Sequence, residues 1–246
     1  MMKKINYLLI LLFFVSCSGP KKTGEKEITV FAAASLTDVI TDLAANFEKE
    51  HQVTVKLSLA ASGTLARQID QGAEADVYLS ANKSWMDFLV EKQKTLETAV
   101  FAKNDLVLVS PLDRNFQFEK VDSLLIYTES KIAIGDPGYV PAGKYAMQVF
   151  DYYKLDLSSK LFQSQDVRSA LMMVELGEAD FGVVYKTDAL QSKKVKVIYT
   201  FPDESHKPVA YYQVLLAKSA LAKEFYDYLY SSEAKKVLTD YSFITN

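Results

Sequence analysis

Four segments of the chain place small or hydroxyl-bearing residues directly before an expected helix. In chain order they are residues 32–38, 60–65, 141–143 and 165–167. Every helix start carries backbone N–H groups that lack an acceptor in their own helix, together with the positive end of the helix dipole. Several such starts directed at one cleft would bind an anion without any lysine or arginine. Alanine and glycine in these segments would let the backbone approach a ligand closely.

Ser35 and Ser62 supply hydroxyl groups in the first two of these segments. Ser35 is expected to be the N-cap of the helix that follows it, with Asp38 three residues later as a variant of the capping box. Asp166 is likewise expected to cap the helix that starts at Val167. Because a serine at a helix start is more often a cap than a ligand, only the four segments together predict a binding site.

The residues that usually carry catalysis are scarce in this sequence. The two histidines, His51 and His206, fall at a helix end and in a polar linker, and both are expected to be exposed. The sequence contains neither the Gly-x-Ser-x-Gly motif of hydrolases nor a phosphate-binding Gly-x-x-x-x-Gly-Lys-Ser/Thr loop. Its acidic residues lack the spacing of a metal-binding loop. The sequence therefore predicts no enzyme, no direct metal ligands and no cofactor.

The composition is that of a soluble globular protein with a small negative charge. Among the 246 residues, 49% are hydrophobic and 24% are charged, which excludes general disorder. The 28 Lys and Arg against 31 Asp and Glu give a formal charge of −3, a balance that does not support a nucleic-acid partner. Cys17 is the one cysteine, so the chain can form no internal disulfide and no cysteine-rich metal site.

The N-terminal region has the pattern of an export signal followed by a tether. A basic start precedes nine consecutive apolar residues at 7–15, too few for the roughly 20 that a membrane-spanning helix needs. Phe14-Val15-Ser16-Cys17 resembles a bacterial lipobox, which predicts removal of residues 1–16 and a lipid on Cys17. Residues 17–27 are polar and contain Gly and Pro, as expected for a flexible tether. Plain secretion with cleavage nearby and a retained structural cysteine are the alternatives.

Apolar, β-branched runs alternate with amphipathic helical patterns along the rest of the chain. Strands are expected at 28–31, 53–59, 77–79, 106–109, 132–134, 181–185, 195–199 and 209–217. Helices are expected at 36–47, 65–71, 85–89, 142–153 and 167–174, and two more between 221 and 240. This alternation predicts an α/β protein with largely parallel sheets. The elements fall into two sets, which predicts two lobes, and the C-terminal helices could return to pack on the first lobe.

In its strand-to-helix segments the chain resembles the molybdate-binding proteins of bacterial ABC transporters. The matching stretches are Phe31–Thr37, Ser62–Gln68, Ala75–Ala81, Gly135–Pro137, Val140–Gly143, Asp166–Arg168 and Phe181–Tyr185. The match extends from Ile28 to the C-terminus. Each motif alone is unspecific, but the set in this order is specific.

The resemblance implies a two-lobed periplasmic-binding-protein fold of type II, with the ligand in a cleft between the lobes. The expected first lobe comprises residues 28–106 and 206–246, and the expected second lobe comprises residues 107–205. In that family the oxyanion is held by hydroxyl and backbone N–H groups, with no counter-ion in contact.

The same resemblance assigns the binding groups residue by residue. Ser35 and Ser62 would each donate a hydroxyl and their own N–H, Ala142 and Val167 would donate backbone N–H groups, and Tyr185 would donate its phenol. The second serine motif is thinner than the family often shows, because Ala61 and Gly63 flank Ser62 where further serines are common.

The implied function is the binding of molybdate, and of tungstate as well, outside the cytoplasmic membrane, and its delivery to the permease of an ABC transporter. The protein would be a monomer, lipid-anchored to the cell membrane and facing the periplasm or cell exterior. Binding of sulfate or another tetrahedral oxyanion is the alternative within the same class. An exported enzyme with Asp166 as its base and a scaffold or adhesin are the alternatives from other classes.

Overall fold

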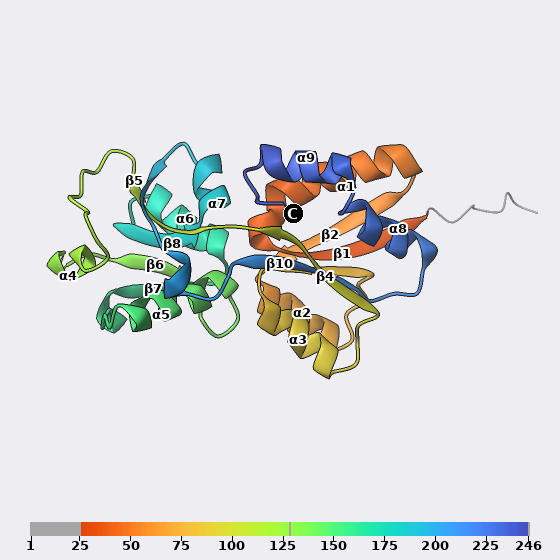
Figure 1. Cartoon of the computed structure of the whole chain (residues 1–246), viewed down its shortest axis with the longest axis horizontal. Helices are drawn as coiled ribbons and strands as arrows, with labels where there is room; N and C mark the ends of the chain where they lie inside the picture. The colour runs from red at the N-terminus through yellow and green to blue at the C-terminus, as the bar shows by residue number, and fades with distance from the viewer. Residues whose placement is uncertain (1–25, 128, 246) are drawn as a thin grey trace, which may run out of the picture.

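The computed structural model describes residues 26–127 and 129–245. Within this part the chain forms two five-stranded sheets with helices on both faces, arranged as two lobes along the long axis of the molecule (Figure 1). The predicted α/β two-lobed fold is therefore confirmed. The predicted signal peptide, Cys17 and the tether up to residue 25 lie outside the described residues.

The first sheet has the strand order β2-β1-β3-β10-β4. Its strands are β1 (Glu27–Ala33), β2 (Thr54–Ala60), β3 (Val77–Ser80), β4 (Glu97–Lys103) and β10 (Ala210–Leu215). β1 runs parallel to both β2 and β3, whereas β10 runs antiparallel to β3 and to β4.

The second sheet repeats this arrangement in the order β7-β6-β8-β5-β9. Its strands are β5 (Leu106–Pro111), β6 (Ile132–Gly135), β7 (Leu161–Ser164), β8 (Phe181–Tyr185) and β9 (Val195–Thr200). β6 is parallel to β7 and β8, and β5 is antiparallel to β8 and β9. The expectation of largely parallel sheets is thus wrong. Both sheets are mixed, because the strand that enters each one from the other lobe, β5 or β10, runs against its neighbours.

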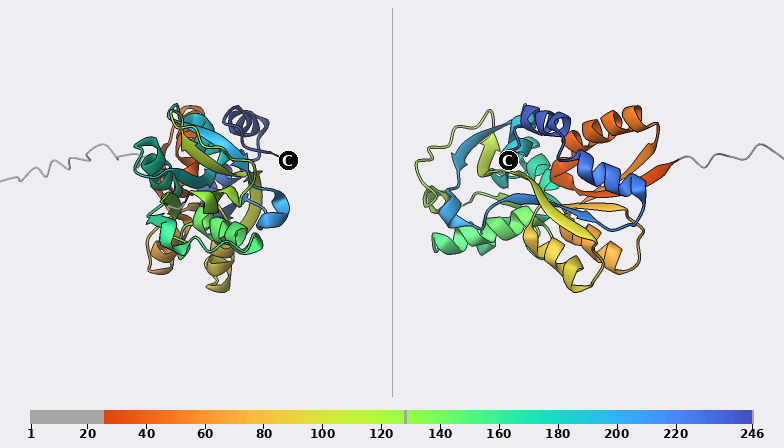
Figure 2. Two further views of the ribbon diagram at one scale, coloured as in Figure 1. Left: turned by 90° about the vertical axis from the view of Figure 1, so that its left-hand side faces the viewer. Right: turned by 45° about the vertical axis from the view of Figure 1, so that its right-hand side comes forward.

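Helices cover both faces of each sheet. The first sheet is flanked by α1 (Thr37–His51), α2 (Ser62–Asp70), α3 (Lys83–Glu91), α8 (Ala220–Tyr228) and α9 (Ser232–Asp240). The second is flanked by α4 (Ser123–Ile126), α5 (Pro141–Tyr152), α6 (Val167–Glu175) and α7 (Lys186–Gln191). The C-terminal helices lie beside α1, as the second view in Figure 2 shows, so the chain ends on the lobe where it began.

The buried face of α1 matches the periodicity of the sequence. Val39, Ile40, Leu43 and Phe47 are all buried against the first sheet. β4 was not expected from the sequence. Its residues do not alternate between buried and exposed, and it is the edge strand next to β10, with one further bridge from Lys103 to Ile244.

The two histidines differ from the expectation that both are exposed. His51 ends α1 as predicted, but it is half-buried and stacks on Phe47 with ring centroids 4.1 Å apart. His206 is buried, with 9% of its surface exposed, because its polar linker packs against Tyr145 of α5. The polarity of a linker does not reveal that it lies against another element.

The parallel strands direct their carboxyl ends toward the space between the sheets. β1 leads into a 3₁₀ turn, η1 (Ala34–Leu36), and β2 leads into α2. β6 and β7 lead into α5 and α6 from the opposite lobe. In open α/β sheets ligands bind outside the carboxyl ends of the strands, and here two such edges face each other.

Candidate functional site: a cavity between the two lobes

A small cavity with a volume of about 10 Å³ lies between the two sheets. All five residues expected at the site line it, namely Ser35, Ser62, Ala142, Val167 and Tyr185. The remaining lining residues are Ala33, Ala34, Ala61, Ala81, Val140, Pro141 and Asp166. The structure therefore brings together groups that are up to 150 residues apart in the sequence, and most of their neighbours have small side chains.

Three helices present their first turns at this cavity. Ser62 is the first residue of α2, Ala142 is the second residue of α5, and Val167 is the first residue of α6. The N–H groups of a first turn have no acceptor within their own helix. Pro141 occupies the first position of α5, where its fixed φ suits the helix and its missing N–H costs nothing. The cavity thus receives N–H donors from both lobes.

Ser35 is not the N-cap that the sequence suggests. It lies within η1, and the next helix begins only at Thr37, whose hydroxyl donates to the Ala34 carbonyl oxygen at 2.7 Å. The Ser35 side chain is free of any capping role because the chain makes this 3₁₀ turn before α1 starts. Its Oγ accepts a hydrogen bond from the hydroxyl of Tyr211 at 3.0 Å.

Ser62 is arranged in the same way as Ser35. It is the first residue of α2 rather than its cap, and its Oγ accepts a hydrogen bond from the Ala81 N–H at 3.0 Å. Its side chain is fully buried. Each serine oxygen at the cavity accepts a hydrogen bond from a donor on β10 or just after β3, so each hydroxyl proton remains for a further acceptor.

Tyr185 closes the cavity at the end of β8. The residue is 1% exposed, and its hydroxyl has no hydrogen-bond partner among the described residues. Burial raises the pKa of this phenol well above its usual range, so the hydroxyl stays protonated. A buried O–H without a partner costs free energy unless a ligand accepts its hydrogen bond.

Asp166 is the one carboxylate that lines the cavity. Its Oδ1 accepts a hydrogen bond from the Ser169 N–H at 2.8 Å, so it is the N-cap of α6, as the sequence predicted. Neither lysine nor arginine lines the cavity. The cavity is therefore lined by neutral hydrogen-bond donors and by one carboxylate, which already caps α6.

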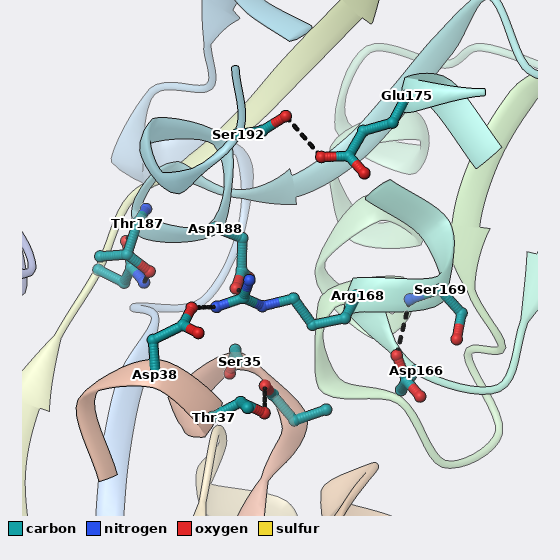
Figure 3. Close-up of polar contacts among 12 residues, drawn as sticks. Ser35, Thr37, Asp38, Asp166, Arg168, Ser169, Glu175, Thr187, Asp188 and Ser192 are labelled. Carbon is teal, nitrogen blue, oxygen red and sulfur yellow. Dashed lines mark hydrogen bonds and ion pairs between the residues drawn. The ribbon is translucent and has the colours of Figure 1, made fainter. Parts of the chain in front are cut away.

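Arg168, which follows Val167, turns away from the cavity into an acidic pair (Figure 3). Its Nε lies 2.6 Å from Oδ1 of the fully buried Asp188, and its Nη2 donates to Asp38 of α1. Burial by itself lowers the pKa of the Arg168 guanidinium, but the two carboxylates raise it by more, so the pKa lies above its usual value. Since Asp38 belongs to the first lobe and Arg168 to the second, this ion pair joins the lobes beside the cavity.

A second contact between the lobes explains why glycine follows Ser62. The Gly63 N–H donates to the Tyr139 carbonyl oxygen at 3.0 Å. A Cβ at Gly63 would lie 2.5 Å from Cε2 of Trp85 and 2.6 Å from that same carbonyl oxygen. No side chain fits at position 63, so this close approach of the two lobes explains why Gly63 rather than a further serine follows Ser62.

Lys144 and Arg67 supply positive charge outside the lining. Nζ of Lys144 lies 4.9 Å and Cζ of Arg67 lies 5.3 Å from the centroid of the Trp85 ring. Burial and, after it, the charge of Arg67 lower the pKa of Lys144. These cations come from opposite lobes and contact the indole rather than the cavity.

Ala81 and Tyr211 contact the two cavity serines, but sequence reasoning did not single them out, although Ala81 ends the matching stretch Ala75–Ala81. The serines they contact lie 19 and 176 residues away along the chain. Tyr211 is one of 15 tyrosines and lies in an ordinary strand pattern, so only the folded sheet reveals its hydroxyl beside Ser35.

The arrangement can bind a compact anion whose oxygens only accept hydrogen bonds. The backbone and hydroxyl donors are preorganised, and the dipoles of three helices favour negative charge at their starts. In the described part of the chain, no group of three or more His, Cys, Asp or Glu side chains could hold a metal ion. The chemistry that the lining offers is recognition by hydrogen bonds from hydroxyl and backbone N–H groups.

Comparison with known proteins places the chain in a family. Residues 28–244 match the family model described as bacterial extracellular solute-binding protein. The chain belongs to this family. The solute-binding protein is 43% identical to the molybdate-binding protein ModA of Escherichia coli, with 92% of each chain covered. It is 38% identical to the molybdate-binding protein ModA of Haemophilus influenzae, over 98% of this chain and 99% of that one.

A solved structure shows the same fold. The periplasmic molybdate-binding protein of Azotobacter vinelandii superimposes on the solute-binding protein with a TM-score of 0.79 at 22% identity, covering 89% of this chain and 99% of that one. The resemblance to molybdate-binding proteins that the motifs indicate is thus confirmed by similarity over almost the whole chain.

Proposed function

We propose that this solute-binding protein binds molybdate, and tungstate as well, outside the cytoplasmic membrane and delivers it to the permease of an ABC transporter. The observation that carries the proposal is the cavity, where three hydroxyl groups and the first turns of three helices surround one small space. The relatives at 43% and 38% identity are named as molybdate-binding proteins. The ligand is an oxyanion and not a cofactor.

A fully ionised tetrahedral oxyanion suits a lining of donors. Its four oxygens accept hydrogen bonds from every direction, and a hydrogen bond to a charged group contributes about 1.5–3 kcal/mol. A protonated oxyanion such as hydrogen phosphate brings an O–H that needs an acceptor, and leaving it unpaired costs about 1–3 kcal/mol. Discrimination between molybdate and sulfate would then depend on the size of the cavity.

The protein acts in this proposal as a carrier and not as an enzyme. Asp166 is the candidate base, but its carboxylate caps α6 through Ser169. Neither histidine lines the cavity, and no second carboxylate does. An acid–base reaction would need such a pair within reach of the substrate.

We further infer that residues 28–106 with 206–246 form one lobe and that residues 107–205 form the other. The cleft lies between the two lobes, and the protein is a monomer. Support comes from the strands, since β1–β4 and β10 share one sheet and β5–β9 share the second. The chain changes sheet between Lys103 and Leu106 and again between Thr200 and Ala210.

The N-terminal region completes the proposal. Residues 1–16 would be a lipoprotein signal, and a lipid on Cys17 with the tether 17–27 would hold the domain at the membrane, facing the periplasm or cell exterior. Among residues 26–127 and 129–245, no helix has the length and apolarity needed to cross a bilayer. The mass of the N-terminal peptide of the processed protein tests this: a diacylated or triacylated Cys17 supports it, and an unmodified chain starting elsewhere contradicts it.

Calorimetric titration of the purified domain with molybdate, tungstate, sulfate and phosphate tests the proposed ligand. Molybdate and tungstate are expected to bind at least a hundredfold more tightly than sulfate or phosphate, which is about 2.7 kcal/mol. Tighter binding of sulfate than of molybdate would replace the ligand by the alternative oxyanion. The absence of binding to all four anions would remove the proposed function.

Ser35→Ala and Ser62→Ala test the two hydroxyl donors. Each substitution is expected to weaken molybdate binding by about 1–3 kcal/mol, because one anion oxygen loses its donor. Ser192→Ala is the matched control, since the hydroxyl of this serine bonds to Glu175 and to the Lys194 N–H, away from the cavity. Unchanged affinity in both cavity variants would exclude these hydroxyls from the site.

A further inference from the structure

The Ser35 hydroxyl is connected to a buried chain of hydrogen bonds behind the cavity. The Tyr211 hydroxyl lies 3.0 Å from the Ser35 Oγ, and Nδ2 of Asn104 lies 3.3 Å from the Tyr211 oxygen. Tyr211 is fully buried and Asn104 is 7% exposed. Asn104 lies between β4 and β5, where the chain passes from one sheet to the other. The series of hydrogen bonds therefore extends from the segment that connects the two sheets to the wall of the cavity.

The direction of these hydrogen bonds is fixed by the amide of Asn104. Its Oδ1 accepts from the Asp105 N–H at 2.9 Å, and the Thr187 N–H also points to this oxygen, at 3.4 Å. The NH₂ group consequently faces Thr187 Oγ1, at 2.8 Å, and Tyr211. An amide nitrogen can only donate, so the tyrosine oxygen must accept from Asn104.

The Tyr211 hydroxyl proton then has a single acceptor in the described part of the chain. Ser35 Oγ is the only hydrogen-bond acceptor recorded for this phenol among the described residues, and burial keeps the phenol protonated by raising its pKa far above its usual range. If Ser35 donated to Tyr211 instead, the tyrosine proton would be buried without an acceptor, at a cost of about 1–3 kcal/mol. Tyr211 therefore donates to Ser35, and the Ser35 proton is left to point elsewhere.

We propose that Asn104 and Tyr211 form a relay that keeps the Ser35 hydroxyl proton available to donate toward the cavity and so favours fully ionised oxyanions, which only accept hydrogen bonds, over protonated ones. The inference rests on the proposed anion site. A serine hydroxyl alone could either donate to an anion oxygen or accept from the O–H of hydrogen phosphate. Tyr211 donates to one of the two lone pairs of the Ser35 oxygen, so the Ser35 proton is not spent on Tyr211 and can donate to a ligand. Tyr211 is thus a positioning residue that acts on specificity without touching the ligand.

Tyr211→Phe removes the relay and keeps the ring, which packs edge-on against Phe101, Tyr185 and Phe243. Titration at pH 8 with sodium molybdate and with sodium phosphate should show molybdate binding about tenfold weaker, which is about 1.4 kcal/mol. Hydrogen phosphate should lose less affinity than molybdate, since Ser35 can accept its O–H whichever way the Ser35 proton points. The affinity ratio of the two anions is the readout that a merely structural role would not move.

A double-mutant cycle with Ser35→Ala separates the relay from other effects. In the Ser35→Ala background, adding Tyr211→Phe should leave molybdate affinity unchanged, because the relay acts through that hydroxyl. An equal, additive loss in both backgrounds, or the same loss for both anions, would overturn the relay. Tyr228→Phe is the control: this tyrosine is also buried, lies on α8 away from the cavity and should leave both affinities unchanged.

Asn104→Asp provides a second variant if Tyr211→Phe does not fold. The aspartate keeps the oxygen that accepts from Asp105 but replaces the donor to Tyr211 with an acceptor, so the tyrosine proton should turn away from Ser35. Molybdate affinity should fall at least as much as in Tyr211→Phe, and unchanged affinity would contradict the proposal. If the unsubstituted protein binds neither molybdate nor tungstate, the proposed function fails; if it binds and these variants match it, only the relay fails.

Discussion

The free energy of unfolding is expected to fall by about 2–3 kcal/mol when the pH rises from about 5 to about 8, because the fold disfavours the charged form of Asp188. This carboxyl group is fully buried in α7, and burial raises its pKa from 3.8 to about 7, although Arg168 partly offsets the shift. Asp38, Asp166 and the phenol of Tyr185 also face it or lie near it.

The direction of the effect follows from the two pKa values. In the unfolded chain Asp188 ionises near pH 4, whereas in the folded chain it holds its proton until about pH 7. Between these values the folded state binds one proton more than the unfolded state, so stability decreases by about 1.4 kcal/mol per pH unit. The contribution is fully present below pH 4 and is lost as the pH rises through 7.

Chemical denaturation at several pH values measures this dependence. Asp188→Asn should flatten the curve between about pH 5 and 8, while every other titratable group remains in both proteins. The difference between the curves therefore isolates Asp188. In Arg168→Met the decline should extend above pH 8, because burial is then unopposed. Parallel curves for the unsubstituted protein and Asp188→Asn would contradict the expectation.

Gly143→Ala is expected to cost about 2–3 kcal/mol of stability and to weaken molybdate binding more than tenfold. Gly143 follows Ala142 in the first turn of α5, where the helix crosses close to the end of β6. A Cβ at this position would overlap the Gly135 carbonyl oxygen and lie 2.7 Å from the carbon of that carbonyl. These are backbone atoms of a sheet strand, so α5 must move, and the Ala142 N–H moves with it out of the cavity.

Gly138→Ala is the matched control for this substitution. Gly138 lies in the exposed turn before α5, and an added Cβ would contact only the carboxylate of Asp136, at 3.0 Å from Oδ1. Thermal unfolding and titration with molybdate should give nearly unchanged values for Gly138→Ala. Normal affinity together with normal stability in Gly143→Ala would show that the start of α5 does not position a ligand group.

The local elements and the candidate donors could be predicted from the sequence, because both depend on short-range patterns. The periodicity at 36–47 indicated the buried face of α1, and Pro141 and Asp166 indicated the starts of α5 and α6. The five expected site residues follow from these helix starts and from the family motifs. From the sequence, it was only an expectation that these residues lie at one cavity, because that depends on how the two sheets are arranged.

Three features were decided only by the tertiary structure. The 3₁₀ turn frees Ser35 from capping, because the direction in which β1 ends sets where α1 can begin. β5 and β10 run antiparallel to their neighbours, because each enters its sheet from the other lobe.

The third feature is the orientation of the serine hydroxyls, which only the tertiary structure sets. The sequence by itself determined which residues carry donors and which helices start beside them, since capping, periodicity and turn chemistry act within a few residues. It could not determine which way a hydroxyl proton points. Tyr211 is 176 residues from Ser35, and Ala81 is 19 from Ser62. Hydrogen-bond direction depends on every partner within about 3 Å, and such partners are brought together only when the sheets pack.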